Sequence, residues 1–365
     1  MLSESRLGFG LMRLPRNEEG SIDQAQVNAM ADRFLEAGFT YFDTAYAYAG
    51  SEEAIRKALV ERYPREAFTL ADKLPAWKLN EPGDPARIFQ ESLERAGVDF
   101  FDYYLLHSIE EKHLPTYEKY DTFSFLKQMK EAGKIRHIGF SYHDGPELLD
   151  AILKDHPELE FVQLQLNYID WENPVIQARR NYEVARRHGK PVVVMEPVKG
   201  GTLAQIVPEA QAEFEKVRPG ASPASWALRF IAEKPGIMTV LSGMSTPEQM
   251  QENTQTIREL EPLSKAEQAA IQKVSEILLD APTIPCTGCS YCPPGCPMQI
   301  QIPRLFTAYN TEKLYGSGPR SRTWYQKYAK DAPASACIGC GQCEGVCPQS
   351  LPIVELLRDV AAVFD

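Results

Sequence analysis

The cysteines are the residues whose type and spacing most directly indicate chemistry. All eight lie between residues 286 and 347 of a 365-residue chain, and residues 1–285 contain none. They form two copies of one pattern, C-x2-C-x2-C-x3-C-P, at Cys286, Cys289, Cys292, Cys296 and Pro297, and at Cys337, Cys340, Cys343, Cys347 and Pro348. Thiolates repeated at such short intervals on one loop predict ligation of a polynuclear metal centre.

The spacing is that of the bacterial ferredoxin run, which binds [4Fe-4S] clusters. In such a run the first three cysteines hold one cluster and the fourth ligates the other. One cluster is therefore expected on Cys286, Cys289, Cys292 and Cys347, and the second on Cys337, Cys340, Cys343 and Cys296. Structural zinc is a weaker alternative because it usually takes separated cysteine pairs. Disulfides would need an oxidising compartment.

Composition and charge exclude several classes of protein. A net charge of −11 argues against nucleic-acid binding, since phosphates favour Lys and Arg. No apolar run approaches the ~20 residues that cross a bilayer. Met1–Arg6 lacks the charged-then-apolar order of a signal peptide. Together with oxygen-sensitive clusters, these features predict a cytoplasmic protein with no nucleic-acid or membrane partner.

The elements that must position any active site are short apolar runs alternating with amphipathic helical segments. The predicted strands are Leu7–Leu11, Thr40–Thr44, Phe68–Leu74, Tyr103–His107, Ile135–Ser141, Phe161–Leu166, Val192–Glu196 and Met238–Gly243. Most are continuous runs, as expected of parallel strands buried on both faces. Eight strand–helix units in about 240 residues predict an α/β fold, the (β/α)8 TIM barrel. A doubly wound open sheet is the alternative, but no G-x-G-x-x-G follows the first strand.

Several helix ends are readable in the sequence. Asp84 followed by Pro85 predicts an N-cap with proline at the first helical position, and Gly97 ends that helix. Asp121 or Thr122 opens another helix, which stops at Gly133. Two further helices begin at sequences that fit capping boxes, Thr246–Gln249 and Ser264–Glu267.

The chain divides into two predicted domains, a barrel over residues 1–280 and a 4Fe-4S ferredoxin-type domain over residues 281–365. Pro282–Pro285 is the expected linker. The second domain is predicted to be small and mainly helical, because Pro297–Ala336 looks more helical than the short hairpins of small ferredoxins. The apolar helical stripe of Ile353–Phe364 is expected to pack back on one of the two domains.

A second group of candidate residues lies at the carboxyl ends of the predicted strands, where barrel enzymes carry their reactive groups. It consists of Asp43, Tyr48, Lys73 and His107. Asp43 is expected to pair with the Lys73 ammonium, which would lower the pKa of the Tyr48 phenol from its ordinary ~10. His107 would orient a carbonyl oxygen, and Tyr48 would protonate it as hydride arrives at carbon. Taken singly, His107 could be a core histidine and Asp43 a helix cap.

The motifs around these residues resemble the aldo/keto reductases. The similarity rests on F-D-T-A-x-x-Y at Phe42–Tyr48, T-L-A-D-K at Thr69–Lys73, D-Y-Y-L-L-H at Asp102–His107, I-G-F-S at Ile138–Ser141 and L-G-F-G at Leu7–Gly10. The resemblance implies a (β/α)8 barrel, NADPH or NADH as hydride donor, and carbonyl or alcohol substrates. It also assigns the four residues to the family's catalytic tetrad. With the cysteine runs, the chain resembles the bacterial and archaeal subgroup fused to a 4Fe-4S domain.

The resemblance also implies a set of cofactor-binding residues. These are Gly10, Leu11, Met12, Ser141, Gln163, Met195, Pro197, Gly201, Leu203, Gly243, Ser245, Gln249, Glu252 and Asn253. Ser141 and Gln163 match positions that bind the nicotinamide carboxamide, and Met195 stands where many members stack a tyrosine. The loop around Gly201 suits the pyrophosphate, since glycines let backbone N–H groups approach.

Departures from the family pattern leave the choice of nicotinamide cofactor open, and the substrate stays open as well. Tyr142 replaces the usual asparagine after the serine, with Asn167 or His143 as candidate substitutes. Gly243 and Gln249 replace the cations that select NADPH, so the choice between NADH and NADPH stays undecided. The expected pocket walls are aromatic side chains, namely Tyr46, Trp77 and Trp171.

The two halves use different electron chemistry. Nicotinamide moves two electrons as a hydride, whereas a [4Fe-4S] cluster moves one, and proteins that join them normally interpose a flavin. No flavin site is readable here. The favoured hypothesis is a carbonyl reductase whose clusters are structural or sense redox state. The second is an electron-transfer enzyme that exchanges electrons with a ferredoxin, flavodoxin or flavoprotein, and the third is a non-enzymatic binding module.

Overall fold

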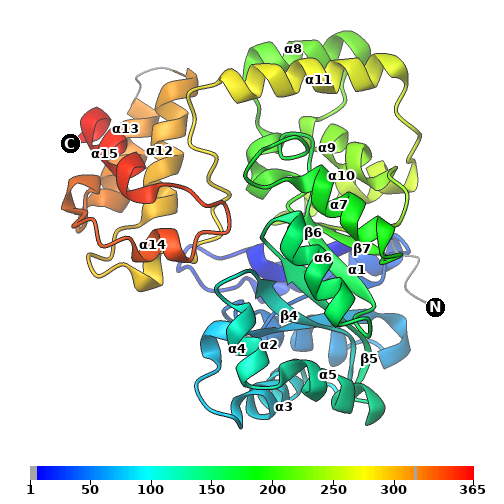
Figure 1. The fold of residues 1–365 in the computed structure, drawn as a ribbon. Helices are drawn as coiled ribbons and strands as arrows, with labels where there is room; N and C mark the ends of the chain where they lie inside the picture. The colour runs from blue at the N-terminus through cyan, green and yellow to red at the C-terminus, as the bar shows by residue number, and fades with distance from the viewer. Residues whose placement is uncertain (1–5, 316–318) are drawn as a thin grey trace. The chain divides into compact units, whose positions relative to one another are not determined.

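A computed structural model of the chain describes residues 6–315 and 319–365 (Figure 1). Its eight parallel strands close into a barrel in chain order, which confirms the predicted fold. The strands are β1 Leu7–Gly10, β2 Tyr41–Asp43, β3 Thr69–Pro75, β4 Phe101–Ile109, β5 Ile135–Tyr142, β6 Phe161–Gln165, β7 Val192–Met195 and β8 Ile237–Ser242. Residues 1–5, part of the segment expected to lack a signal sequence, lie outside the described residues.

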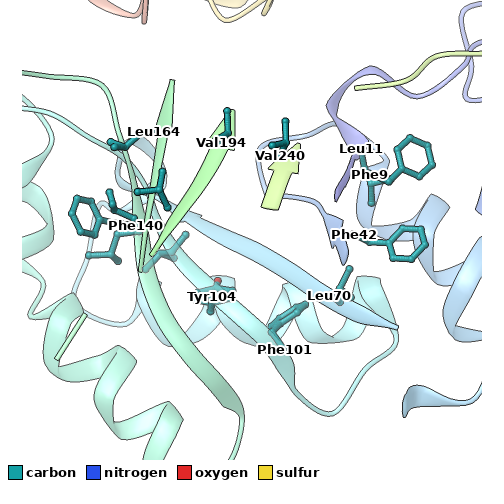
Figure 2. Packing of buried hydrophobic residues seen from close by; sticks show 14 of the residues in the cluster. Phe9, Leu11, Phe42, Leu70, Phe101, Tyr104, Phe140, Leu164, Val194 and Val240 are labelled. Carbon is teal, nitrogen blue, oxygen red and sulfur yellow. The ribbon is translucent and has the colours of Figure 1, made fainter. Parts of the chain in front are cut away.

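The strands read as unbroken apolar runs because both of their faces are buried. One set of alternate side chains fills the inside of the barrel, including Tyr41 of β2, Ala71 of β3 and Leu105 of β4. Their neighbours in the chain belong to the larger outer core beneath the helices, as Figure 2 shows for Phe42 and Leu70. This alternation decides which residues face inward near the strand ends.

The helices of the barrel unit are α1 Gln24–Glu36, α2 Ser51–Ile55, α3 Asp84–Ala96, α4 Leu114–Lys119, α5 Thr122–Glu131, α6 Pro146–Asp155, α7 Ala178–Arg187, α9 Pro223–Ala232 and α10 Pro247–Arg258. Each buries an apolar stripe. The Phe89 ring of α3, for example, lies edge-on to Tyr104 of β4 at a centroid distance of 4.9 Å. No described helix is both long and apolar enough to cross a membrane.

The predicted helix ends are largely confirmed, with one shift. Helix α5 follows Asp121, and Thr246 accepts a hydrogen bond from the Gln249 N–H at the start of α10. The N-cap of α3 is Gly83 rather than Asp84. Asp84 is the first helical residue, and its carboxylate instead accepts the backbone N–H groups of Asn80 and Glu81 at 2.6 Å and 3.0 Å.

The chain forms two compact units, and the second includes a segment that lies between β7 and β8 in the sequence. One unit comprises Met1–Val198 and Ala224–Lys265, and the other Lys199–Pro223 and Ala266–Asp365. The helices of the second unit are α8 Pro208–Val217, α11 Lys265–Asp280, α12 Ile302–Tyr315, α13 Pro319–Ala329, α14 Gln342–Gly345 and α15 Ile353–Phe364. The domain boundary after residue 280 remains a prediction, because these units divide the chain at other positions.

The second unit has its own small apolar core. Ile300, Leu305 and Val360 are fully buried in it. The terminal helix α15 packs back on this core, since the Phe364 ring stacks on Tyr325 at 4.5 Å and the Tyr325 hydroxyl donates to Asp365 at 2.5 Å. The expectation of a mainly helical cysteine domain with a packed tail helix is confirmed.

Candidate functional site

The barrel strands bring the four predicted tetrad residues together. Asp43 ends β2, Lys73 lies in β3 and His107 lies in β4, at positions that continue the inward-facing set of their strands. Lys73 is completely buried, and its Nζ donates to Asp43 Oδ1 at 2.5 Å and to the Thr44 carbonyl at 2.6 Å. The predicted ion pair is therefore present, held between two rigid neighbouring strands.

Tyr48 reaches this pair from the loop that follows β2. The Lys73 ammonium lies 4.9 Å from the centroid of its ring, and the His107 ring lies edge-on at 5.8 Å. The Tyr48 N–H donates to the Ala45 carbonyl at 2.9 Å, so a tight turn fixes the position of the phenol. A cation, a phenol and an imidazole thus meet at one end of the barrel.

Burial dominates the electrostatics of this cluster. It raises the pKa of Tyr48 well above its ordinary value, and the Asp43 carboxylate raises it further. The expected net lowering of the phenol pKa is therefore wrong in direction, because desolvation and the Asp43 carboxylate outweigh the lowering by the Arg13 guanidinium. Burial likewise holds the pKa of His107 well below its usual range, with the Lys73 ammonium adding to the effect. At neutral pH Tyr48 keeps its proton and His107 is uncharged.

Burial also acts on the acidic partner of the ion pair. It raises the pKa of Asp43, while the charge and hydrogen bond of Lys73 oppose that rise. The pair is stable because the two charged groups compensate each other and because the Thr44 carbonyl accepts a second hydrogen bond from the ammonium. The arrangement can hold a proton on Tyr48 beside a neutral hydrogen-bonding group.

Two of the expected nicotinamide-binding residues are neighbours in the sheet. Ser141 of β5 lies opposite Gln163 of β6. The Ser141 hydroxyl accepts the Ser108 N–H at 2.7 Å, and Gln163 Nε2 contacts the Met195 sulfur at 3.6 Å. Within the described part of the chain, the buried Gln163 Oε1 has no hydrogen-bond partner. A buried acceptor of this kind suits the amide group of a bound nicotinamide.

Asn167, one of the two candidate substitutes for the missing asparagine, is engaged elsewhere. The Asn167 amide donates to Asp170 at 2.7 Å and to the Glu196 carbonyl at 3.1 Å. Tyr142 is buried, and its hydroxyl donates to the Gly145 carbonyl at 2.5 Å. Burial lowers the pKa of His143 to about 4, which leaves this imidazole neutral.

The residues expected to contact the rest of the nicotinamide cofactor lie along β1, β8 and α10 and directly after β7. Gly10, Leu11 and Met12 end β1 and begin the following turn, and Pro197 follows β7. Ser245 N–H donates to the Gln249 side chain at 2.8 Å, and the Ser245 hydroxyl donates to the Arg13 carbonyl at 2.7 Å. Asn253 is buried and donates to Ser242 at 3.0 Å, whereas Glu252 is exposed.

The sequence reasoning missed an ion pair that joins the β1 and β7 ends. Arg13 Nη2 lies 3.3 Å from Glu196 Oε1. A side chain at Gly243 would approach Arg13 at 3.8 Å, so a cation stands next to one of the positions where the family's cations are replaced. Glu196 has a left-handed backbone with φ of 54°. The signal available in the sequence was Arg13 itself, three residues after the end of a strand.

Of the three expected pocket aromatics, Trp77 contacts the tetrad. Its ring lies 5.1 Å from His107, and 41% of the residue is exposed. Tyr46 instead donates to Glu91 at 2.8 Å. Trp171 packs edge-on against Phe230 at 5.6 Å. These contacts differ from the expectation because the loops carrying Tyr46 and Trp171 turn those side chains toward neighbouring helices.

The second unit contains the last two expected cofactor residues and all of the cysteines. Gly201 has a φ of 98° and Leu203 is buried, both in the turn Lys199–Ala204 after β7. All eight cysteines lie in the described residues, and none of them forms a disulfide.

The cysteines line two hollows in the crossed pairing that their spacing predicts. The first hollow is lined by Cys286, Cys289, Cys292 and Cys347, and the second by Cys296, Cys337, Cys340 and Cys343. The two hollows are similar in size, as two equal cofactors would need. Ile302 borders both hollows, so they are adjacent.

Comparison with known proteins agrees with this geometry. The profile of the aldo/keto reductase family matches residues 6–276, and that of the 4Fe-4S dicluster domain matches residues 285–351. An NADH-specific methylglyoxal reductase of Escherichia coli (strain K12) is 26% identical over 321 residues, which cover 75% of this chain and 95% of that protein.

Further relatives share the barrel part. An aldo-keto reductase of Mycolicibacterium smegmatis is 30% identical over 200 residues, covering 54% of this chain and 66% of that protein. A solved aldo-keto reductase structure from Bacillus halodurans, in its holo form, has a TM-score of 0.60 at 28% identity and covers 75% of this chain and 92% of that one. The chain therefore belongs to the aldo/keto reductase family of oxidoreductases, and a 4Fe-4S dicluster domain follows its barrel.

Proposed function

We propose that the protein is an NAD(P)H-dependent oxidoreductase that reduces a small carbonyl compound, or oxidises the matching alcohol, with Tyr48 as the proton donor. The observation that carries the proposal is a protonated phenol standing beside a buried ion pair and a neutral imidazole. A reduced nicotinamide, NADPH or NADH, would supply the hydride to the carbonyl carbon. The orphaned oxygen of Gln163 is the feature of this chain that best fits it.

Each tetrad residue has a separate task in this reaction. Neutral His107 positions the carbonyl oxygen, because one ring nitrogen carries a hydrogen to donate. Tyr48 gives its hydroxyl proton to that oxygen as negative charge develops on it. The Lys73 ammonium stabilises the phenolate left behind, and Asp43 holds Lys73 in place. Water then returns a proton to Tyr48.

The cysteine hollows support two [4Fe-4S] clusters. The first would be held by Cys286, Cys289, Cys292 and Cys347, and the second by Cys337, Cys340, Cys343 and Cys296. Across residues 6–315 and 319–365, no three or more His, Cys, Asp or Glu side chains come close enough to hold a single metal ion. The assignment to [4Fe-4S] clusters rests on the C-x2-C-x2-C-x3-C-P spacing and on the four cysteines that line each hollow.

A second candidate function is electron transfer with an external partner, such as a ferredoxin, flavodoxin or flavoprotein. It is favoured by the second hollow, where Cys340 is exposed and two apolar side chains reach solvent. Ile338 is 63% exposed and Met298 is 38% exposed. A cluster at such a surface could pass single electrons to a docked protein. Oxygen-sensitive clusters would place either activity in a reducing compartment, the cytoplasm.

The decisive experiment is the substitution Tyr48→Phe. Loss of the proton donor should lower kcat for carbonyl reduction by about 10²–10⁴-fold, the usual contribution of general acid catalysis. Methylglyoxal is the first substrate to test, with NADH and NADPH compared as donors. Binding of the nicotinamide, followed by fluorescence, should not change.

Tyr46→Phe is the matched control, because the Tyr46 hydroxyl is engaged with Glu91 instead of the tetrad. Full activity of the Tyr48→Phe variant would overturn the assignment of the proton donor. Bleaching of the cluster absorbance by NADH or NADPH without a carbonyl compound would favour the second candidate function.

A further inference from the structure

The turn after β7 has an unusual backbone that its own sequence only partly explains. Lys199, Gly200 and Gly201 all have positive φ angles, of 47°, 64° and 98°. Glycine adopts such angles freely, but a lysine does so at a cost. A strained residue persists where its surroundings determine its position, and those surroundings are in the cysteine unit, to which this turn belongs.

Gly200 touches the backbone of the first cysteine run. A Cβ atom at Gly200 would lie 2.1 Å from the Thr287 carbonyl oxygen and 2.7 Å from the Thr287 Cα. Thr287 follows Cys286 directly and lines the first hollow. Because backbone atoms cannot move aside as a flexible side chain can, only glycine fits at residue 200. Gly201, the next residue, has nothing within 4 Å of its corresponding position.

Lys199 brings a positive charge to the same hollow. It is 5% exposed, and its Nζ lies 3.5 Å from Gln349 Oε1. Gln349 lines the first hollow and follows its fourth cysteine, Cys347, by two residues. Gln349 therefore stands between the Lys199 ammonium and the first hollow. An ammonium at this place would act on the charge of a cluster held in the hollow.

The second hollow has a carboxylate in the corresponding place. Glu344 Oε1 accepts the Val354 N–H at 2.8 Å, and Val354 lines the second hollow. Apart from the cysteines, the described residues that line the two hollows are uncharged. A cation thus contacts the lining of the first hollow, and a carboxylate contacts the lining of the second. Charges close to a cluster influence its reduction potential, because reduction adds one negative charge.

We propose that the turn after β7 completes the site of the first cluster, with Gly200 seating the loop of Cys286 and Lys199 supplying a buried cation, so that the first cluster is reduced more easily than the second. This inference rests on the proposed pair of clusters. One electron enters the first cluster from an external reductant and no bond changes. Electrons arriving at the exposed second cluster would thus settle on the first cluster.

The charge effect is tested by an anaerobic redox titration followed by electron paramagnetic resonance. Cys289→Ser and Cys340→Ser identify which signal belongs to which cluster. Lys199→Met should move the midpoint potential of the first cluster to a more negative value and leave that of the second unchanged. Lys199→Arg, which keeps the charge, should restore most of the difference. A first-cluster potential that is the same in Lys199→Met and wild type overturns the inference.

The contact is tested by iron content with a matched pair of glycine variants. Gly200→Ala should lose the first cluster, so that iron falls from about eight to about four atoms per chain. Gly201→Ala, which has similar backbone strain but open space, should keep about eight. Equal iron in the two variants contradicts the role of Gly200. A wild-type protein without iron would instead refute the clusters themselves, so the two failures are distinguishable.

Discussion

The tetrad and the cysteine hollows bring reactive groups together in different ways. The tetrad stands on strands β2 to β4, and Lys73 meets its partner Asp43 within the chain. The cysteines stand on loops, where the only regular elements between Cys286 and Ile300 and between Cys337 and Leu351 are the short turn Pro293–Gly295 and the one-turn helix α14. The first site is organised by the backbone, whereas the second would be organised around the proposed clusters.

The apolar cores beneath the two sites also differ, in their size. The barrel rests on a large apolar core that includes the fully buried Phe9, Phe34 and Tyr104. The cysteine unit has a much smaller cluster around Ile300 and Leu305. Small cores leave little net stability, so domains of this size often depend on a bound metal centre. We therefore expect the two sites to respond very differently to the same perturbation.

Removal of iron should have the largest effect and should act on one side of the comparison. Stripping iron with a chelator under reducing conditions should lower the opening free energy of residues 286–301 and 337–351 toward ~0 kcal/mol, as in frayed segments. Hydrogen exchange followed by mass spectrometry measures this change. Strands β2 to β4 should keep their protection. Equal loss of protection in the barrel would show that the two regions fold as one unit.

Lys73→Met should be the most destabilising change at the tetrad. It leaves the buried Asp43 carboxylate without its cation, which typically costs about 3–5 kcal/mol of the free energy of unfolding. Urea denaturation followed by circular dichroism measures the difference. The double variant Asp43→Asn with Lys73→Met should recover much of it, because no lone charge remains buried. Iron content should stay unchanged. A parallel loss of iron would contradict the view that the tetrad and the cysteine unit respond separately.

The sequence predicts the barrel and the tetrad for an identifiable reason. Parallel strands buried on both faces give unbroken apolar runs, and strand ends such as Asp43 and His107 then fall together by topology. The cysteine spacing likewise predicts which four thiols share each hollow. These features depend on order and spacing along the chain, which the sequence contains directly.

Other features depend on burial and on loop paths, which the sequence does not contain. The pKa of Tyr48 rises because desolvation and the Asp43 carboxylate outweigh the Arg13 guanidinium, and this balance depends on the packing. The Arg13–Glu196 pair joins residues 183 positions apart. Lys199 and Gly200 resembled part of a phosphate loop, and their contacts with Gln349 and Thr287 became visible only in three dimensions.

The direction of the Tyr48 pKa shift gives a third prediction, on activity instead of stability. Burial keeps the phenol protonated, so kcat/KM for carbonyl reduction should stay level between about pH 7 and pH 9. A phenol with a pKa lowered to about 7 would lose its proton in this range, and kcat/KM would fall about fiftyfold between pH 7 and pH 9. A pH profile with saturating nicotinamide measures the difference. Such a fall would mean that the bound nicotinamide and substrate lower the pKa of Tyr48 despite its burial.

The smallest expected effect concerns His143, another imidazole of the barrel unit held neutral by burial. Its folded-state pKa is about 4, below the unfolded value of about 6.5. The unfolded chain therefore takes up a proton first as the pH falls, and wild type loses stability below about pH 6.5 relative to a variant without this group. The free energy of unfolding of His143→Gln should rise by about 1.4 kcal/mol relative to wild type between pH 7.5 and pH 5.5.

Urea denaturation at both pH values measures this gain, and comparing the two pH values cancels the contribution of every group that the variants share. The rates of amide hydrogen exchange in the cysteine unit should not change in His143→Gln, because His143 belongs to the barrel unit. A gain of equal size at both pH values would show that packing, and not the missing proton, explains the change.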